Sequence, residues 1–266
     1  KDIQIKINNL KKLIIIKKKY IKLSGVWVRF ISAGSLEEIT FKLSVLHILK
    51  DIGVYVHNSA STIEKTVDKF RTSSILKLNN FSVPETKIFL NKNDFINNTL
   101  RSFKKKKALL LKPLFGSQGK GIKILKNYKE IMEIFPSGGV YYLQNFIGNI
   151  NKKKFTDIRV LMSGHKVISC IQRTSSNAIT NFSQGSSVKK IEISKKLSQD
   201  CKLISKLFKL GYGGIDIKIN NNETFILEIN SIPSWKGVQS VENRNITEIL
   251  VGQFIKFIKN DDSKKL

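Results

Sequence analysis

The chain has 266 residues, of which 41% are hydrophobic and 9% aromatic, and this composition excludes a wholly disordered protein. The longest purely apolar runs, Leu13–Ile16 and Ala108–Leu111, are far shorter than the roughly 20 residues of a membrane span, so no membrane contact is expected. The formal net charge is +27, from 47 basic and 20 acidic residues, and only six of the basic residues are arginines.

This lysine excess bears on the choice of partner. Base reading and bidentate phosphate contacts favour arginine, and the abundance of Lys, Asn and Ile is typical of an AT-rich genome. A compositional origin of the charge is therefore favoured over selection for nucleic acid, although the field would still attract an anionic substrate. Cys170 and Cys201 have no metal-binding spacing and indicate reduced core thiols, so a cytoplasmic location is expected.

Residues 1–60 are expected to form a small N-terminal α/β domain. Short strands are predicted at Leu13–Ile16, Val26–Ile31 and Val54–Val56. Before the last of these, Ser35 begins a helix with a capping box to Glu38, and Gly53 ends it. The apolar stripe of this helix consists of Leu36, Ile39, Leu43, Leu46 and Leu49.

Two α+β units are expected to follow, over residues 61–140 and 141–266. In the first, helices are predicted near 61–80, 93–103 and 128–135, and strands at 86–90, 108–112 and 122–125. In the second, strands are predicted at 140–147, 157–162, 166–173, 215–219 and 224–229, and helices at 194–211 and 243–259. Residues 174–187 are polar and are expected to be irregular.

The stretch from Gly213 to Gly237 places the oxygen ligands Asp216, Glu228 and Asn230 among apolar residues. Buried carboxylates are costly unless a cation or hydrogen bonds satisfy them, and oxygen-only ligands suit Mg²⁺. Because side chains alternate along a strand, an odd-numbered loop would put Asp216 and Glu228 on one face of the hairpin. A two-residue turn would put them on opposite faces and contradict a metal site. The alternative interpretation is an ordinary hairpin with polar ends.

A second candidate site is the glycine-rich loop Gly116-Ser117-Gln118-Gly119-Lys120-Gly121 between two predicted strands. Glycines let backbone amides approach a phosphate. The loop is neither a Walker A motif nor a dinucleotide fingerprint, because a strand follows it where those motifs need a helix. Alone it is as consistent with a plain hairpin as with a phosphate cover. Lys112, which ends the strand before the loop, favours phosphate binding.

Together these motifs form an ordered set along the chain: Asp68-Lys69, Lys112-Pro113, the glycine-rich loop, Gln144–Ile147, Asp157-Ile158-Arg159, Arg173, Asp216 and Glu228-Ile229-Asn230. This order and spacing resemble the ATP-grasp superfamily, and within it the RimK-like amino-acid ligases, from about Val26 to Val241. The resemblance implies an ATP-grasp fold, of mixed α/β and α+β class, that holds ATP between two α+β halves. It also implies an ATP-dependent ligase that forms an acyl phosphate on a carboxylate, which the amine of L-glutamate then attacks.

The resemblance further implies a role for each matching residue. Lys69 and Lys112 would contact phosphates, and Asp216, Glu228 and Asn230 would hold Mg²⁺ or Mn²⁺. Arg159, Arg173 and Asn181 fall where the family positions the acceptor carboxylate and the reacting phosphate. The other ATP contacts implied are Gly116, Ser117, Gln118, Gly119 and Gly121 in a mobile loop, Gln144, Asn145, Phe146 and Ile147 at the adenine, and Asp157.

One departure is Asn145, where the family usually has Glu, which puts an acidic nucleotide contact there in doubt. Residues 178–185 and 231–239, which include Trp235, are more similar to ligases that glutamylate a tetrahydromethanopterin-type cofactor than to enzymes that modify ribosomal proteins. Trp235 is predicted either to form an aromatic wall for the acceptor or to pack on the core.

Three functions stay open at this point. The first two are glutamate ligation to such a cofactor and glutamate ligation to the C terminus of a ribosomal protein. The third is a non-catalytic, basic RNA- or ribosome-binding protein on an ATP-grasp scaffold. A homo-oligomer is compatible with each of these functions.

Overall fold

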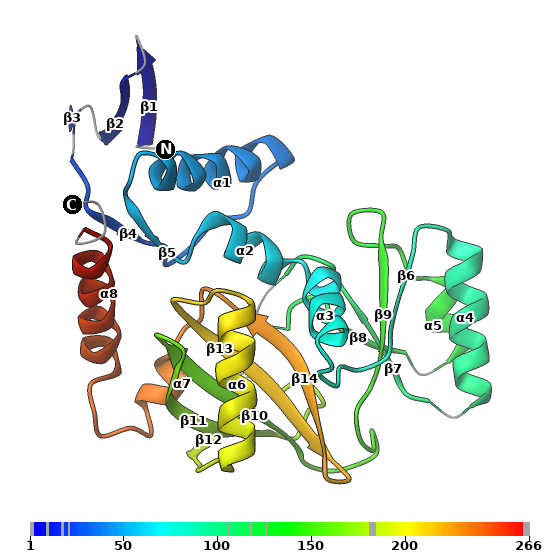
Figure 1. Ribbon diagram of the computed structural model, residues 1–266. Coiled ribbons are helices and arrows are strands. Elements are labelled where there is room, and N and C mark those ends of the chain that lie inside the picture. Colours follow the sequence, from blue (N-terminus) through cyan, green and yellow to red (C-terminus); the bar gives the residue numbers. More distant parts are fainter. Residues whose placement is uncertain are drawn as a thin grey trace.

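The computed structural model contains mixed helices and sheets (Figure 1). It describes residues 3–8, 11–16, 19–20, 22–105, 107–116, 119–125, 127–180 and 185–262. No helix in these ranges is long and apolar enough to cross a membrane. Cys170 and Cys201 are free and buried, as predicted, and burial raises the pKa of each thiol to about 12.

The N-terminal part contains two small sheets. An antiparallel meander of β1 (Ile3–Asn8), β2 (Lys11–Ile16) and β3 (Lys19–Tyr20) comes first, and of these only β2 was predicted. Next, β4 (Gly25–Trp27) pairs in parallel with β5 (Tyr55–His57). The connection between these two strands is helical, which is the usual solution for parallel neighbours.

That connection is α1 (Leu36–Asp51), and it begins as its sequence predicts. The Ser35 side chain accepts a hydrogen bond from the Glu38 amide, and the Glu38 carboxylate accepts one from the Ser35 amide. Gly53, with φ of 84°, supplies the left-handed residue after the helix. The predicted apolar stripe is wrong at its first position, because Leu36 is 79% exposed and the buried apolar positions lie further along the helix.

The single helix predicted over residues 61–80 is two helices, α2 (Ala60–Val67) and α3 (Lys69–Leu78). They separate at Asp68, whose ψ of 104° is not helical. Its carboxylate accepts hydrogen bonds from the amides of Phe70 and Arg71 and thereby caps α3. Lys69 is therefore the first residue of a helix.

A four-stranded antiparallel sheet follows, in the order β6-β9-β7-β8. Its strands are β6 (Thr86–Phe89), β7 (Leu109–Lys112), β8 (Lys123–Leu125) and β9 (Tyr141–Asn145). The core under α4 (Lys92–Lys104) and α5 (Tyr128–Met132) contains Phe95 stacked on Tyr141 at 4.4 Å. This unit lies at the right of Figure 1.

A five-stranded antiparallel sheet, in the order β12-β11-β10-β13-β14, forms the centre of the molecule. Its strands are β10 (Phe155–Ser163), β11 (Lys166–Ser175), β12 (Ser187–Lys190), β13 (Tyr212–Asn220) and β14 (Glu223–Asn230). The prediction that residues 174–187 are irregular is wrong at both ends, because β11 continues to Ser175 and β12 begins at Ser187.

Helices lie on both faces of this sheet. α6 (Lys195–Leu207) packs on one face, and Leu76 of α3 joins the same core. The other face carries α7 (Lys236–Gln239) and α8 (Ile246–Asp262) at one end. At its opposite end that face bears charged side chains instead of an apolar core. The domain boundaries expected near residues 60 and 140 stay predictions.

Candidate active site

The β13–β14 hairpin has a two-residue turn, which was predicted to put Asp216 and Glu228 on opposite faces and so to contradict a metal site. Asn221 and Asn222 form it, with φ of 48° and 62°. Asp216 nevertheless lies opposite Glu228, because Leu227 forms a β-bulge that shifts the register between Asp216 and Ile217. The stated condition was therefore wrong. The bulge places both carboxylates on one face, as an odd-numbered loop would have done.

A chain of alternating charges crosses this face. Arg159 donates two hydrogen bonds of 2.6 Å to the carboxylate of Asp216. Arg173 also contacts Asp216, at 2.9 Å, and donates two hydrogen bonds, of 2.7 and 2.5 Å, to Asp157. Strand register explains the grouping, because Arg159 pairs with Asp216 across β10–β13 and Asp157 pairs with Arg173 across β10–β11.

These groups are buried and hold one another charged. The side chain of Arg173 is 2% exposed and that of Asp216 is 7% exposed. Burial alone would raise the pKa of Asp216, but Arg159 and Arg173 hold it well below its usual range. Burial alone would lower the pKa of Arg173, whereas Asp216 and Asp157 raise it above its usual value. The face therefore carries fixed charges of both signs.

The two predicted phosphate lysines lie near Glu228 but belong to different elements. Lys112 ends β7, and its ammonium donates a 2.6 Å hydrogen bond to the side-chain carbonyl of Gln144. The Gln144 amide is held in turn by Thr86 and Tyr142. Burial lowers the pKa of Lys112 to about 8, although Glu228 opposes that shift.

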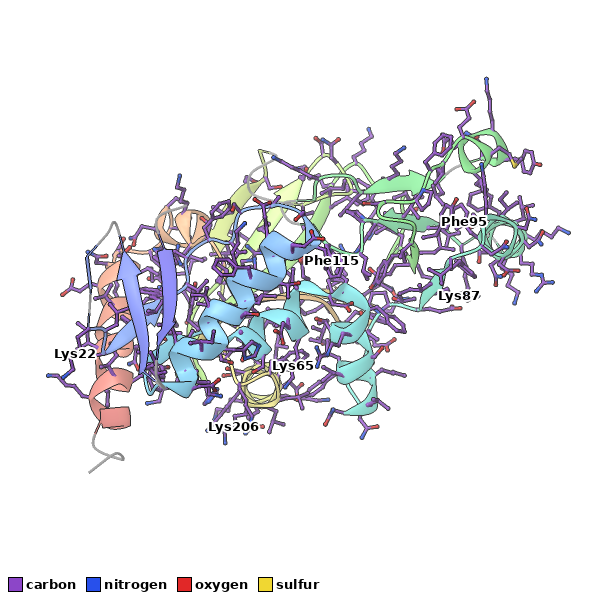
Figure 2. The ribbon with its side chains drawn as sticks, turned by 90° about the horizontal axis from the view of Figure 1, so that it is seen from above. Lys22, Lys65, Lys87, Phe95, Phe115 and Lys206 are labelled. Atoms are coloured by element: carbon purple, nitrogen blue, oxygen red, sulfur yellow. The ribbon has the colours of Figure 1, made fainter. Side chains whose placement is uncertain are left out.

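Lys69 begins α3, and burial also lowers its pKa, against the opposing charges of Glu228 and Asp68. Its ammonium contacts the backbone carbonyls of Leu114 and Gly116, at 3.3 and 3.0 Å. Lys69 thus connects α3 to the first half of the glycine-rich loop. Figure 2 labels Phe115, the residue just before this loop, between Lys65, near the end of α2, and the four-stranded unit that contains Phe95.

The described part of the glycine-rich loop has the backbone that its sequence predicts. Gly119 and Gly121 have positive φ angles of 72° and 75°. Ser117 and Gln118, also predicted to contact ATP, lie outside the described residues.

Two adjoining hollows lie between the four-stranded and the five-stranded sheet. The smaller contains Lys69, Lys112, Gly116, Gly119, Lys120 and Glu228 in its lining. The larger contains the predicted adenine segment, Gln144–Ile147, together with Asp157, Arg173 and Asp216. Both share Lys112, Ile122, Leu227 and Glu228. The structure thus brings most of the predicted ATP residues to one cleft.

The predicted adenine segment is held by its neighbours. The Asn145 side chain donates a 2.8 Å hydrogen bond to Glu85, and its amide donates to the Glu85 carbonyl. The Phe146 amide donates to Ala108. The Ile147 amide has no hydrogen-bond partner among the described residues and lines the cleft, which suits a backbone contact to a base. Asn145 is uncharged, so it does not supply the acidic nucleotide contact that a Glu at this position would make.

The predicted acceptor residues fare differently. Asn181 lies outside the described residues. Trp235 is half-buried, stacks on Trp27 at 5.7 Å and donates a hydrogen bond to Thr247. Trp235 does not appear in the lining of either hollow. Its packing role is present in the structure, and its acceptor role stays a prediction.

The predicted metal ligands fit a hard cation. Asp216 has a free lone pair on Oδ1 beyond its Arg159 bond, and the Asn230 carbonyl, which accepts from the Ile232 amide, can accept once more. The Glu228 carboxylate makes no hydrogen bond or ion pair within the described ranges. These ranges contain no group of three His, Cys, Asp or Glu that could hold a metal. Two carboxylates and an amide leave positions for water and phosphate oxygens, which Mg²⁺ prefers.

Some residues at the site were not anticipated from the sequence. Leu227, the bulge residue, lines both hollows, and Lys218 lines the larger one and donates to the Thr156 carbonyl. Outside the cleft, Arg29 contacts the carbonyl of Pro233. Rarity was a usable signal for Arg29, because arginine is scarce in this lysine-rich chain and Arg159 and Arg173 lie on the same sheet face.

Comparisons with known proteins agree with this geometry. The model of the RimK-like ATP-grasp domain matches residues 66–258. A tetrahydromethanopterin:alpha-L-glutamate ligase of Methanococcus maripaludis is 32% identical over 243 residues, covering 89% of this chain and 80% of that protein. The protein of that name from Methanocaldococcus jannaschii is 30% identical, covering 83% and 76%. A structure of the ATP-grasp ligase PsnB with minimal precursor, Mg and ADP has a TM-score of 0.69 at 18% identity, covering 95% and 85%.

Proposed function

The chain belongs to the RimK-like ATP-grasp family, and we infer that it is an ATP-dependent ligase that adds L-glutamate to a carboxylate-bearing acceptor. We propose a tetrahydromethanopterin-like cofactor as that acceptor. The observation that carries the proposal is the meeting of Lys69, Lys112, Glu228, Asp216 and Arg173 in one cleft between two sheets. A triphosphate needs cations, a metal ion and a cleft, and these residues would provide the cations and the metal ligands along the walls of one cleft.

The reaction divides into two steps. The γ-phosphoryl group of ATP passes to an oxygen of the acceptor carboxylate, which gives an acyl phosphate and ADP. The glutamate amine then attacks the acyl carbon, inorganic phosphate leaves with the bonding electrons, and the amine loses a proton as the amide forms. Asp216, Glu228 and Asn230 would hold Mg²⁺, which would supply positive charge to offset that of the phosphates.

The cationic side chains supply the remaining electrostatics. Lys112 and Lys69 would hold the phosphates, and a bound phosphate would raise the pKa of Lys112 again and keep it charged. Gln144 fixes the position of the Lys112 ammonium. Arg173, buried and held by two carboxylates, would face the transferred group without needing to reorganise during the reaction. The glycine-rich loop would cover the acyl phosphate and exclude water.

The choice of acceptor rests on relatives rather than on the cleft. The two methanogen ligases, at 32% and 30% identity, support the tetrahydromethanopterin-like cofactor over a ribosomal protein C terminus. The non-catalytic RNA-binding alternative does not explain why Lys112, Gln144 and Arg173 are buried and paired within the cleft.

The test is a set of matched incubations. The protein is mixed with ATP, Mg²⁺, L-glutamate and either tetrahydromethanopterin or a ribosomal-protein C-terminal peptide, and products are read by mass spectrometry. The proposal expects glutamyl addition to the cofactor and phosphate release only when all components are present. Addition to the peptide alone would overturn the acceptor. Salt-sensitive RNA binding with no ATP turnover would overturn the ligase.

A further inference from the structure

An arginine outside the cleft is held in place on an aromatic surface. The guanidinium carbon of Arg29 lies 3.8 Å from the centre of the Trp235 ring and 5.3 Å from that of Trp27. Its Nη1 contacts the Tyr212 hydroxyl at 3.3 Å and the Pro233 carbonyl at 3.5 Å. Stacking and these bonds fix the guanidinium, so little rotamer entropy remains to be lost when an anion binds.

The donors of this arginine are only partly used. Arg29 is exposed, and both of its hydrogen bonds come from Nη1 and go to neutral oxygens. Within the described residues Arg29 has no acidic partner, and neither Nε nor Nη2 makes a hydrogen bond. A planar guanidinium with one free edge matches a carboxylate or a phosphate.

The position of Arg29 connects it to the reaction centre. Pro233 and Arg159 flank Gly214, since a Cβ built there would lie 3.5 Å from the Pro233 side chain and 3.6 Å from Arg159 Nε. Gly214 lies two residues before Asp216 on β13 and so faces the same side of the sheet. Arg29 therefore continues a row of cations that begins at Arg173 and passes through Arg159.

We propose that Arg29, held on Trp235 and Trp27, binds a second anionic group of the acceptor, separate from the carboxylate that is activated beside Arg159 and Arg173. The group is an oxyanion, either a phosphate or a carboxylate. This inference rests on the proposed ligase function, because it takes the bound molecule to be the acceptor of that reaction. Anion binding at Arg29 can nevertheless be measured without turnover. It also gives Trp235 a definite role, which is to hold the arginine.

The chain provides its own probe for this site. Its only two tryptophans are Trp27 and Trp235, and both contact Arg29. Intrinsic fluorescence therefore reports the proposed site and not the phosphate cleft. Inorganic phosphate and glutarate are titrated separately into the protein with ADP and Mg²⁺ present at saturation, so that Lys69 and Lys112 are already occupied. The more effective anion identifies the group.

Three variants complete the test. Arg29→Gln removes the charge, Arg29→Lys keeps the charge without the planar fork, and Arg101→Gln is a matched control on the exposed side of α4. We expect Arg29→Gln to weaken anion binding about 10- to 100-fold, the usual range for a charged bidentate contact. Arg29→Lys should be intermediate and Arg101→Gln unchanged. With tetrahydromethanopterin as substrate, Arg29→Gln should raise the acceptor KM by a similar factor and leave the KM for ATP unchanged.

The outcomes separate this inference from the proposed function. If neither anion changes the fluorescence of the unmodified protein, or if Arg29→Gln titrates like it, the inference is overturned. If the anion titration distinguishes Arg29→Gln but no glutamyl product forms on tetrahydromethanopterin, the site stands and the choice of acceptor fails. If Arg29→Gln weakens ATP binding as much as it weakens anion binding, Arg29 does not form a site separate from the phosphate cleft, and the inference is overturned.

Discussion

Replacement of Arg173 by Met tests whether the charged face is a connected network. Arg173 is shared by Asp157 and Asp216, and the side chains of all three are at least nine-tenths buried. After Arg173→Met, Asp216 retains Arg159, whereas Asp157 loses its only ion-pair partner among the described residues. An unpaired buried carboxylate typically costs about 3–5 kcal/mol. Arg159→Met should cost less, about 1–3 kcal/mol, because Asp216 then retains Arg173.

The assay is urea unfolding, followed by circular dichroism at pH 7.5 and pH 5, with Arg101→Met as the control. Burial already raises the pKa of Asp157 against the opposing charge of Arg173, and in Arg173→Met the loss of that cation raises it further above the unfolded value of about 3.9. A raised carboxyl pKa destabilises the fold at high pH, and the penalty fades as the pH falls through the folded pKa. The stability loss should therefore be smaller at pH 5. Adding Asp157→Asn should restore part of it, because both charges are then absent.

Two results would refute this reasoning. Equal losses for Arg159→Met and Arg173→Met would show that Asp157 does not depend on Arg173. A loss of unchanged size at pH 7.5 and pH 5 would show that no uncompensated carboxylate was created.

Three further predictions concern the cleft. Asp216→Asn should abolish ligation and weaken Mg²⁺-dependent ADP binding, measured by calorimetry, and full activity would refute the metal assignment. ADP affinity should fall as the pH rises through about 8, because Lys112 then loses its charge. In Lys112→Met the ADP affinity should be roughly 10- to 100-fold lower and should not fall further over this pH range. Deleting Leu227 should leave the protein folded with Asp216 opposite Glu228, since the ladder is then regular, but raise the KM for ATP; complete unfolding would contradict the register.

Much of the fold could be predicted because local chemistry decides it. The capping box at Ser35 and the positive-φ turn at Gly164-His165 depend on residues next to each other. The break at Asp68 was also readable, since Asp followed by a helical run is a capping signal, yet the apolar spacing on both sides concealed it. Strand β1 was missed although Ile3, Ile5 and Ile7 alternate with polar residues as in a half-buried strand, whereas β3 has only two residues and carries no pattern.

The residues that meet in the cleft were singled out from the sequence, but the register that brings them together was not. The turn Asn221-Asn222 led to the wrong condition for a metal site, because the bulge at Leu227 leaves no mark in the sequence. At this bulge β14 pairs with β13 and also bonds to the segment before β6, through the Ile226 amide and the Ser82 carbonyl. The pairing of Arg159 with Asp216 likewise depends on strands that are 57 residues apart. Such non-local pairings are set by the whole sheet.

The two lysines predicted to hold phosphates are attached to different sheets. Leu76 anchors α3, and so Lys69, to the core of the five-stranded sheet, whereas Lys112 ends a strand of the four-stranded sheet. Any hinge motion between the sheets changes the spacing between these two ammonium groups. A nucleotide that bridges them would act as a spacer that sets the angle of closure. The length of the polyphosphate, more than its total charge, would then decide whether the two sheets close over the nucleotide.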